Sequence, residues 1–258
     1  MGPVLLPCGS CIGCKKARSK EWAERCLHEL ESSKESCFTT LTYSDENLPL
    51  RSNLVKSHLQ GFIKRLREDI SKDKRRLRYF ACGEYGRRYG RPHYHVIFFG
   101  VGLHDSSIIE QAWGLGRVHI GSVTFASCRY VANYILDKDS VKTDPLASIH
   151  TVKPFQMQSQ GLGKDWLDKN ADQVLYDVGI RREGKVGGMP RYYRKRLGDR
   201  LCQDDIDQRA KRRIVETALT YERHGLKDKR SIAEYERKSR AQKEEELKSI
   251  QARKLGKL

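Results

Sequence analysis

Two histidines in the stretch 91–99, RPHYHVIFF, have the types and spacing to bind a metal ion. The stretch alternates with period two and is rich in aromatic and β-branched residues, which predicts a β-strand. His93 and His95 then share one face of that strand, where two neutral imidazoles can hold one divalent cation. Residues 79–92 predict an incoming strand and a Gly-rich basic turn, so the two strands form a hairpin with Glu84 near the histidines. Two imidazoles and a carboxylate leave positions open on a metal, which suits catalysis; the alternative is two unrelated histidines and a carboxylate paired with arginine.

Two tyrosines further along the chain can supply a nucleophile. Tyr130 and Tyr134 lie four residues apart in the stretch 127–138, so on a helix they share one face. Such a pair usually packs in a core. Beside a metal-binding strand it has a chemical meaning, because a tyrosine hydroxyl can attack a phosphodiester that a metal ion polarises.

The charge balance favours a polyanionic partner. The formal net charge is +17, with 50 Lys and Arg against 33 Asp and Glu. Most of this basic excess lies before residue 203, so it belongs to the folded body and not to a tail. The expected DNA contacts combine cations that bind phosphates with rings that stack on bases. They are Arg87, Arg88 and Arg91 in the basic turn, and Arg191, Tyr192, Tyr193, Arg194 and Lys195 near the end of the basic body. The alternative for the second group is a basic surface whose tyrosines pack.

Three cysteines near the N-terminus recur every third residue. Cys8, Cys11 and Cys14, separated by Gly and small residues, can wrap a structural zinc ion, with Cys26 or Cys37 as the fourth ligand. The alternative is a set of reduced thiols in a turn. A disulfide framework is not expected in a cytosolic chain.

The periodicity of the chain predicts an α+β fold. The expected helices are 16–33, 53–71, 105–113, 127–138 and 204–224, and the expected strands are 36–43, the hairpin 77–99 and 116–125. Because the hairpin forces an antiparallel pair, the sheet is expected to be antiparallel or mixed, with helices packed on one face. Residues 139–165 are expected to be irregular, and His119 to be a surface or packing histidine. Two domains are expected: 1–200, which carries the chemistry, and 201–258, a basic, charge-rich extension that is helical or partly disordered.

Taken together, these motifs resemble a known family. GEYG (83–86), GRPHYH (90–95) and YVANY (130–134), with CGSCIGC (8–14), FTTLTY (38–43) and PRYYRKRL (190–197), are similar to the replication initiation proteins of microviruses, closest to the gokushovirus branch. These are HUH endonucleases with two tyrosines. The resemblance covers roughly residues 7–197 and implies a central antiparallel sheet flanked by helices.

The resemblance also implies a mechanism, rolling-circle replication. A tyrosine nicks origin DNA, forms a covalent 5′-phosphotyrosine, and the displaced strand is later religated into a single-stranded circle. It implies Mg²⁺ or Mn²⁺ held by His93, His95 and Glu84, and as partners phage origin DNA, a host helicase and a host polymerase. One departure stands out: the family often has Lys before the second tyrosine, where this chain has Asn133. Lys138, one helical turn beyond Tyr134, is the expected substitute.

Composition excludes some classes and leaves others open. No apolar run approaches the ~20 residues that a membrane span needs, and the N-terminus lacks the features of a signal peptide, so a cytosolic location is expected. The resemblance implies that this is the cytoplasm of a bacterial host. Two other functions remain open. One is a different HUH transferase, a relaxase or a transposase. The other is a zinc-stapled nucleic-acid-binding protein without catalysis.

Overall fold

The structure of the protein is a computed structural model. It describes residues 7–9, 11–86, 89–137, 152–182, 184–228, 230–239, 241–242 and 245. The chain divides into two compact units, one of Met1–Val174 with Gly179–Arg196 and one of Leu175–Val178 with Leu197–Leu258.

The first unit is built on a five-stranded sheet in the order β4-β1-β3-β2-β5. Every neighbouring pair of strands is antiparallel. The strands are β1 (Ser36–Thr42), β2 (Arg78–Tyr85), β3 (Pro92–Phe99), β4 (Val118–Gly121) and β5 (Phe155–Gln158). The α+β class and the β2–β3 hairpin are as predicted. β5, by contrast, lies inside the stretch expected to be irregular.

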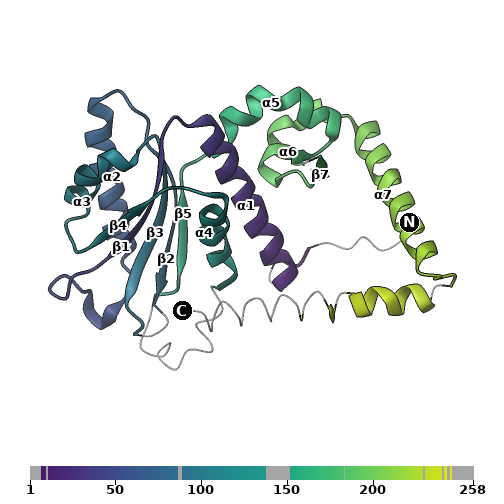
Figure 1. The fold of residues 1–258 in the computed structure, drawn as a ribbon, viewed down its shortest axis with the longest axis horizontal. Coiled ribbons are helices and arrows are strands. Elements are labelled where there is room, and N and C mark those ends of the chain that lie inside the picture. The colour runs from purple at the N-terminus through teal and green to yellow at the C-terminus, as the bar shows by residue number, and fades with distance from the viewer. Residues whose placement is uncertain are drawn as a thin grey trace. The chain divides into compact units, whose positions relative to one another are not determined.

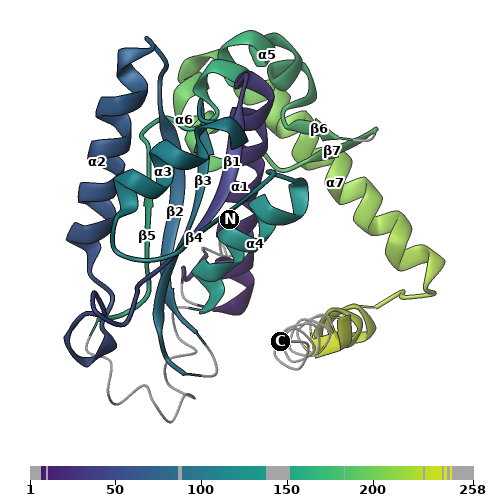
Figure 2. The same cartoon turned by 60° about the vertical axis from the view of Figure 1, so that its left-hand side comes forward.

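Helices cover both faces of this sheet, so the expectation of helices on one face was wrong (Figures 1 and 2). α2 (Lys56–Lys72) and α3 (Ser106–Trp113) pack on one face, and α1 (Ile12–Ser32) and α4 (Phe125–Asp137) lie on the other. The reason lies in β3. Tyr94, Val96 and Phe98 enter the core beneath α2 and α3, while Ile97 and Phe99 enter the core beneath α1 and α4. A strand that is apolar on both sides has no face for water.

The segment after β5 packs along α1. It contains α5 (Lys164–Asp177), β6 (Ile180–Arg182), β7 (Lys185–Gly187) and α6 (Arg191–Leu197). Glu29 on α1 ties it to the sheet, because the carboxylate forms a buried 2.8 Å ion pair with Arg78 and accepts a 2.7 Å hydrogen bond from the Gly163 amide. In the described part of the chain the short 3₁₀ helices are η1 (Leu50–Ser52), η2 (Leu103–Asp105) and η5 (Gly198–Arg200).

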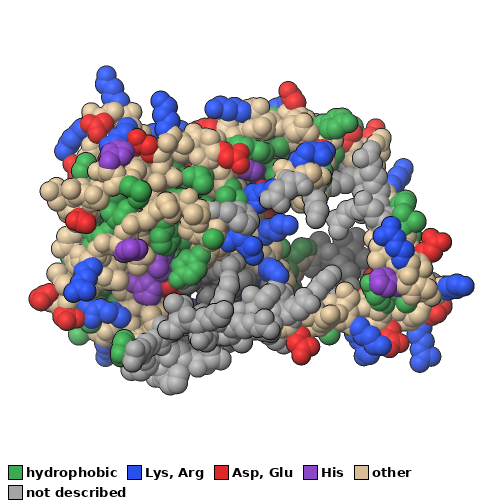
Figure 3. All heavy atoms as spheres, in the orientation of Figure 1, with side chains coloured by type: hydrophobic (Ala, Val, Ile, Leu, Met, Phe, Trp, Pro, Cys, Tyr) green, Lys and Arg blue, Asp and Glu red, His purple; other side chains and the backbone are tan. Residues whose placement is uncertain are grey.

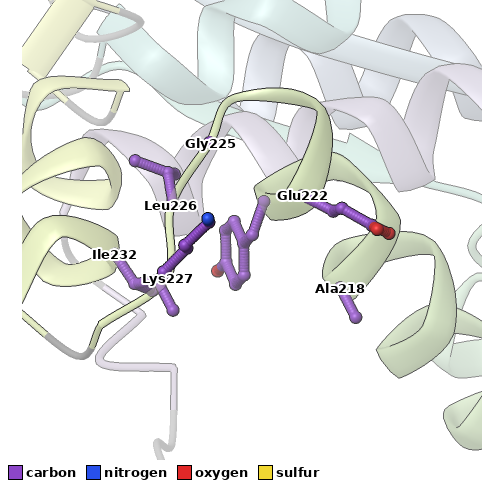
Figure 4. Close-up of a pocket in the computed structure, with 7 residues that line it drawn as sticks. Ala218, Glu222, Gly225, Leu226, Lys227 and Ile232 are labelled. Carbon is purple, nitrogen blue, oxygen red and sulfur yellow. The ribbon is translucent and has the colours of Figure 1, made fainter.

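The second unit is helical. α7 (Gln203–Arg223) ends at a turn in which Gly225 adopts φ +67°, a left-handed conformation that glycine tolerates. A further helical stretch covers residues 230–239. Tyr221 on α7 donates a hydrogen bond to Glu236 across this turn. Leu226 and Ile232 line a shallow pocket with the end of α7 (Figure 4).

Candidate active site

The pairing of β2 with β3 brings the expected metal ligands together. Glu84 lies directly opposite His93, and His95 follows on the same face. Oε1 of Glu84 lies 2.6 Å from Nε2 of His93 and 2.9 Å from Nε2 of His95. The three ligand atoms lie within 4.8 Å of one another. Three such atoms can surround one small cation.

The second ring nitrogen of each histidine is also engaged. Nδ1 of His93 donates to the carbonyl oxygen of Arg91 at 3.1 Å, and Nδ1 of His95 lies 3.0 Å from Oγ1 of Thr40. Because a carbonyl oxygen only accepts, Nδ1 of His93 carries a proton and the neutral ring presents a lone pair at Nε2. Such bonds fix the orientation of metal-binding histidines. The motif alone does not reveal Thr40; the β1–β3 register does, because it places Thr40 opposite His95.

The surroundings of these three side chains favour an ionised carboxylate. Burial raises the pKa of Glu84, but hydrogen bonds with His93 and His95 outweigh burial and hold that pKa below its ordinary value. Burial lowers the pKa of His93, but contact with Glu84 outweighs it, so the net pKa is raised. At His95 burial prevails and the pKa is lowered. A negative oxygen between two imidazoles is a donor set that fits a divalent cation.

α4 places Tyr130 beside these ligands. Cys128 and Val131 are fully buried against α1 and the sheet and anchor the helix. The side chain of Tyr130 stays 41% exposed. Its ring centroid lies 5.5 Å from that of His95 and 6.5 Å from that of Phe38. A half-exposed phenol next to a ligand ring is close to the metal-binding groups and still reachable by a substrate.

Four other expected site residues cannot be placed in this way. Tyr134 lies on α4 one turn after Tyr130, but its side chain is outside the described part of the chain. Lys138, Arg87 and Arg88 also lie outside the described residues. Their roles stay predictions.

The expected DNA-contacting cations differ in their surroundings. Arg91 forms a 2.7 Å ion pair with Asp45 and donates a 2.7 Å hydrogen bond to the carbonyl of Tyr43. Arg191, Arg194 and Lys195 are exposed on α6. The ion pair and the hydrogen bond of Arg91 therefore tie it to the loop that contains Asp45, whereas the cations of α6 face solvent.

The two tyrosines of α6 are packed, and the expectation that Tyr193 stacks on a base was wrong. Tyr193 is fully buried, and its hydroxyl lies 2.8 Å from Nδ1 of His28. Trp166 stacks on His28 at 3.5 Å between ring centroids. Tyr192 is half-buried, with the guanidinium of Arg25 4.2 Å from its ring centroid. Because α6 is a helix, the neighbouring tyrosines point to different sides, so Tyr193 is buried while Tyr192 is only half-buried.

The three N-terminal cysteines cluster at the start of α1. Sγ of Cys8 and of Cys14 lie 3.9 Å apart, and backbone amides of Cys11 and Cys14 donate to the sulfurs of Cys8 and Cys11. The fourth ligand expected from Cys26 or Cys37 does not join them, because both side chains are fully buried in the two cores. Cys26 lies about 18 Å further along α1, at 1.5 Å per residue.

A second group of ligand-type residues has a different character. Glu35, His104 and Asp105 also place ligand atoms within 4.8 Å of one another. Arg75, however, forms ion pairs of 3.3 Å with Glu35 and 2.8 Å with Asp105. Because a guanidinium already neutralises these carboxylates, the group is a structural network.

None of the helices described here is long and apolar enough to span a membrane.

Comparisons with known proteins show the family to which the chain belongs. The model of the family "Replication-associated protein ORF2/G2P" matches residues 36–139, which contain strands β1 to β4 and helix α4. The chain is 33% identical over 230 residues to the replication-associated protein ORF2 of Spiroplasma virus 4, a match that covers 78% of this chain and 70% of that protein. It is 33% identical over 214 residues to the replication-associated protein VP4 of Bdellovibrio phage phiMH2K, covering 75% and 67%. It is 28% identical over 221 residues to the replication-associated protein ORF4 of Chlamydia phage 1, covering 77% and 55%. No solved structure matches the chain. The chain belongs to the replication-associated proteins of microviruses.

Proposed function

We propose that this protein is a rolling-circle replication initiator, a metal-dependent, site-specific DNA endonuclease and strand transferase of the HUH type. It nicks phage origin DNA through a tyrosine and religates the displaced strand into a single-stranded circle. The observation that carries this proposal is the position of Tyr130 against His95, beside the carboxylate–histidine cluster.

Each residue of the cluster has a proposed role. Glu84, His93 and His95 would hold Mg²⁺ or Mn²⁺, which supplies Lewis-acid polarisation of the scissile phosphate when bound. Thr40 and the Arg91 carbonyl orient the two imidazoles. The fixed rings leave the same lone pairs available in every turnover, so the site needs little reorganisation.

Tyr130 is the proposed first nucleophile. Its phenol oxygen bonds to phosphorus as the bond from phosphorus to the 3′ oxygen breaks. The phenol loses its proton to solvent, and the leaving oxygen gains one to become a 3′-OH. The energy of the phosphodiester is kept in the 5′-phosphotyrosine, so no nucleotide hydrolysis is required.

Tyr134 provides for the second transfer. After a host helicase and a host polymerase have displaced one strand, it cuts the regenerated origin. The released 3′-OH then attacks the first phosphotyrosine and closes a circle. Lys138 is proposed to stabilise the phenolate or the leaving oxygen, the role that Asn133 cannot fill. These steps place the protein in the cytoplasm of the bacterial host, bound to duplex and single-stranded origin DNA.

A structural zinc ion on Cys8, Cys11 and Cys14 is part of the proposal. The support is the close approach of the three sulfurs and the amide bonds that two of them accept. Metal analysis of purified protein is expected to find zinc that Cys14→Ser removes and that Cys202→Ser, a change at an exposed cysteine elsewhere, retains. Equal zinc in both variants would contradict this assignment.

The test of function is cleavage of supercoiled DNA that carries the cognate phage origin. We expect relaxed circles with protein on the 5′ end, formed with Mn²⁺ or Mg²⁺ and lost with EDTA. Tyr176→Phe, at an exposed tyrosine of α5, serves as the matched control for Tyr130→Phe. Cutting of short single strands but not of the duplex would indicate a relaxase or transposase instead. Binding without cutting of either substrate would leave a non-catalytic DNA-binding protein.

A further inference from the structure

The face of the sheet that carries the metal-binding cluster continues onto the edge strand β4. In the register of β1 with its neighbours, Thr40 lies opposite His95 on one side and His119 on the other. Directly paired residues share a face, so His119 and His95 point to the same side of the sheet. At roughly 4.8 Å per strand, they lie about 10 Å apart.

Arg117 extends this arrangement by one step. The amide of Thr42 donates to the carbonyl of Arg117, and Thr42 itself lies opposite His93. Arg117 and His119 are two residues apart on β4 and therefore share a face. The rows Arg117–Thr42–His93 and His119–Thr40–His95 thus run side by side across β4, β1 and β3.

This part of the face is open. α4 packs against β2, β3 and α1, with Tyr130 at its border touching Phe38 of β1. Arg117 and His119 are exposed, and Thr40 and Thr42 are only half-buried. Histidine side chains reach the surface over the strands (Figure 3). Neither Arg117 nor His119 has a side-chain hydrogen bond or ion pair with another residue that the structure describes.

The exposed part of the face formed by Arg117, His119, Thr40 and Thr42, here called the β1–β4 shelf, has side chains that can bind a nucleic-acid backbone. Arginine and imidazole donors bind phosphate oxygens, and threonine hydroxyls donate to them as well. β4 is also an edge strand, and no other residue that the structure describes pairs with the outer side of its backbone. The shelf ends at Tyr130 and the metal-binding cluster, where the scissile phosphate would lie.

We propose that Arg117 and His119 bind backbone phosphates next to the scissile phosphate, and that the β1–β4 shelf is the track along which single-stranded DNA reaches Tyr130. The assignment rests on the proposed nicking function for its orientation. Its contacts are with phosphates, so they do not depend on base sequence.

The test measures binding without cleavage. Full-length protein with Tyr130→Phe, in EDTA, is titrated with a fluorescein-labelled oligothymidylate at several salt concentrations and followed by anisotropy. Arg117→Ala is expected to weaken binding severalfold and to reduce the slope of log K against log salt by about 0.7, the value for one phosphate contact on a single strand. The double variant with His119→Ala is expected to weaken binding further, and Arg117→Lys to keep the slope.

The matched control is Arg67→Ala, which removes the same charge from an exposed position on α2, beyond the opposite face. An equal affinity and slope for Arg117→Ala and Arg67→Ala would overturn the assignment, as would a lack of binding by the parent protein. Binding that depends on Arg117, together with the absence of a tyrosyl–DNA adduct when the unsubstituted protein is incubated with Mn²⁺ and origin DNA, would instead support the track and refute the nicking function.

Discussion

Tyr130 packs edge-on against His95, with ring planes at 79° and centroids 5.5 Å apart. His95 in turn shares the Oε1 oxygen of Glu84 with His93. A phenol on a helix and two imidazoles on a strand are thereby held in one cluster by separate elements. The proposed nucleophile and the proposed metal ligands are therefore all carried by a helix and two strands and not by loops.

The first prediction concerns metal affinity. His93→Ala and Glu84→Ala each remove one of three converging ligand atoms. We expect Mn²⁺ binding, measured by calorimetry, to weaken by more than about 100-fold, because changes in the surrounding shell alone cost about 10–100-fold. His104→Ala is the control, since its cluster is already neutralised by Arg75. Unchanged affinity in Glu84→Ala, or its loss in His104→Ala, would place the metal elsewhere.

Thr40 gives a second prediction, about positioning. Thr40→Val keeps the shape of the side chain and removes the hydroxyl that meets Nδ1 of His95. We expect a loss of about 10-fold or more in Mn²⁺ affinity and in nicking rate, and recovery in Thr40→Ser, which restores the hydroxyl. If Thr40→Val and Thr40→Ser behaved alike, the hydrogen bond would have no role in orienting His95.

Metal binding should also depend on pH in a defined direction. Without metal, the pKa of His93 is raised above 6.5, and a ligand must be neutral. Mn²⁺ affinity is therefore expected to rise as pH rises through the pKa of His93, with release of a proton. Glu84→Gln removes the negative charge that raises the pKa of His93 and leaves the burial that lowers it and the Arg91 carbonyl that raises it, so the pH profile should move to lower pH. An unshifted profile would show that Glu84 does not set this pKa.

The same groups give a stability prediction for metal-free protein. The raised pKa of His93 means that its protonated form stabilises the folded state below the unfolded pKa, and that this contribution is lost as pH rises through the folded pKa. The lowered pKa of Glu84 means that its contribution is present above its unfolded pKa and lost as pH falls through its folded pKa. Urea unfolding in EDTA should show both trends in the parent protein. Glu84→Gln should flatten both, and unchanged pH trends in that variant would contradict the pairing.

A substitution at Tyr193 tests whether this residue stabilises the fold or contacts DNA. Tyr193→Phe leaves Nδ1 of the buried His28 without its hydrogen-bond partner, so we expect a loss of about 1–3 kcal/mol in the free energy of unfolding. The affinity for DNA should not change. A weaker affinity with an unchanged stability would show instead that the Tyr193 hydroxyl contacts DNA.

Local sequence patterns predicted much of the fold. The alternation in β3 predicted a strand and its two histidines, and the Gly-rich turn predicted the hairpin that sets Glu84 opposite His93. The 3.6-residue pattern predicted α2, whose Leu59, Phe62 and Leu66 are buried. In these cases the residues that predict a strand or helix also determine which part of the sheet it pairs with or packs against.

The remainder depends on long-range contacts. β5 reads Phe-Gln-Met-Gln, a period-two alternation of only four residues, which is too short to predict a strand without its pairing with Phe80–Gly83 of β2. Tyr193 is buried because His28 and Trp166, far away in sequence, surround it. The role of Thr40 likewise follows from register across two strands. Pairing of this kind is a property of the whole sheet and not of one segment.

The most direct measurement is the identity of the residue that becomes bonded to DNA. Full-length protein is incubated with Mn²⁺ and origin DNA, digested with protease and nuclease, and analysed by mass spectrometry. We expect a 5′-phosphonucleotide on Tyr130 or Tyr134, and no adduct in the Tyr130→Phe/Tyr134→Phe double variant. Cleavage without an adduct on either tyrosine, or with an adduct on another residue such as Tyr89, would contradict the account.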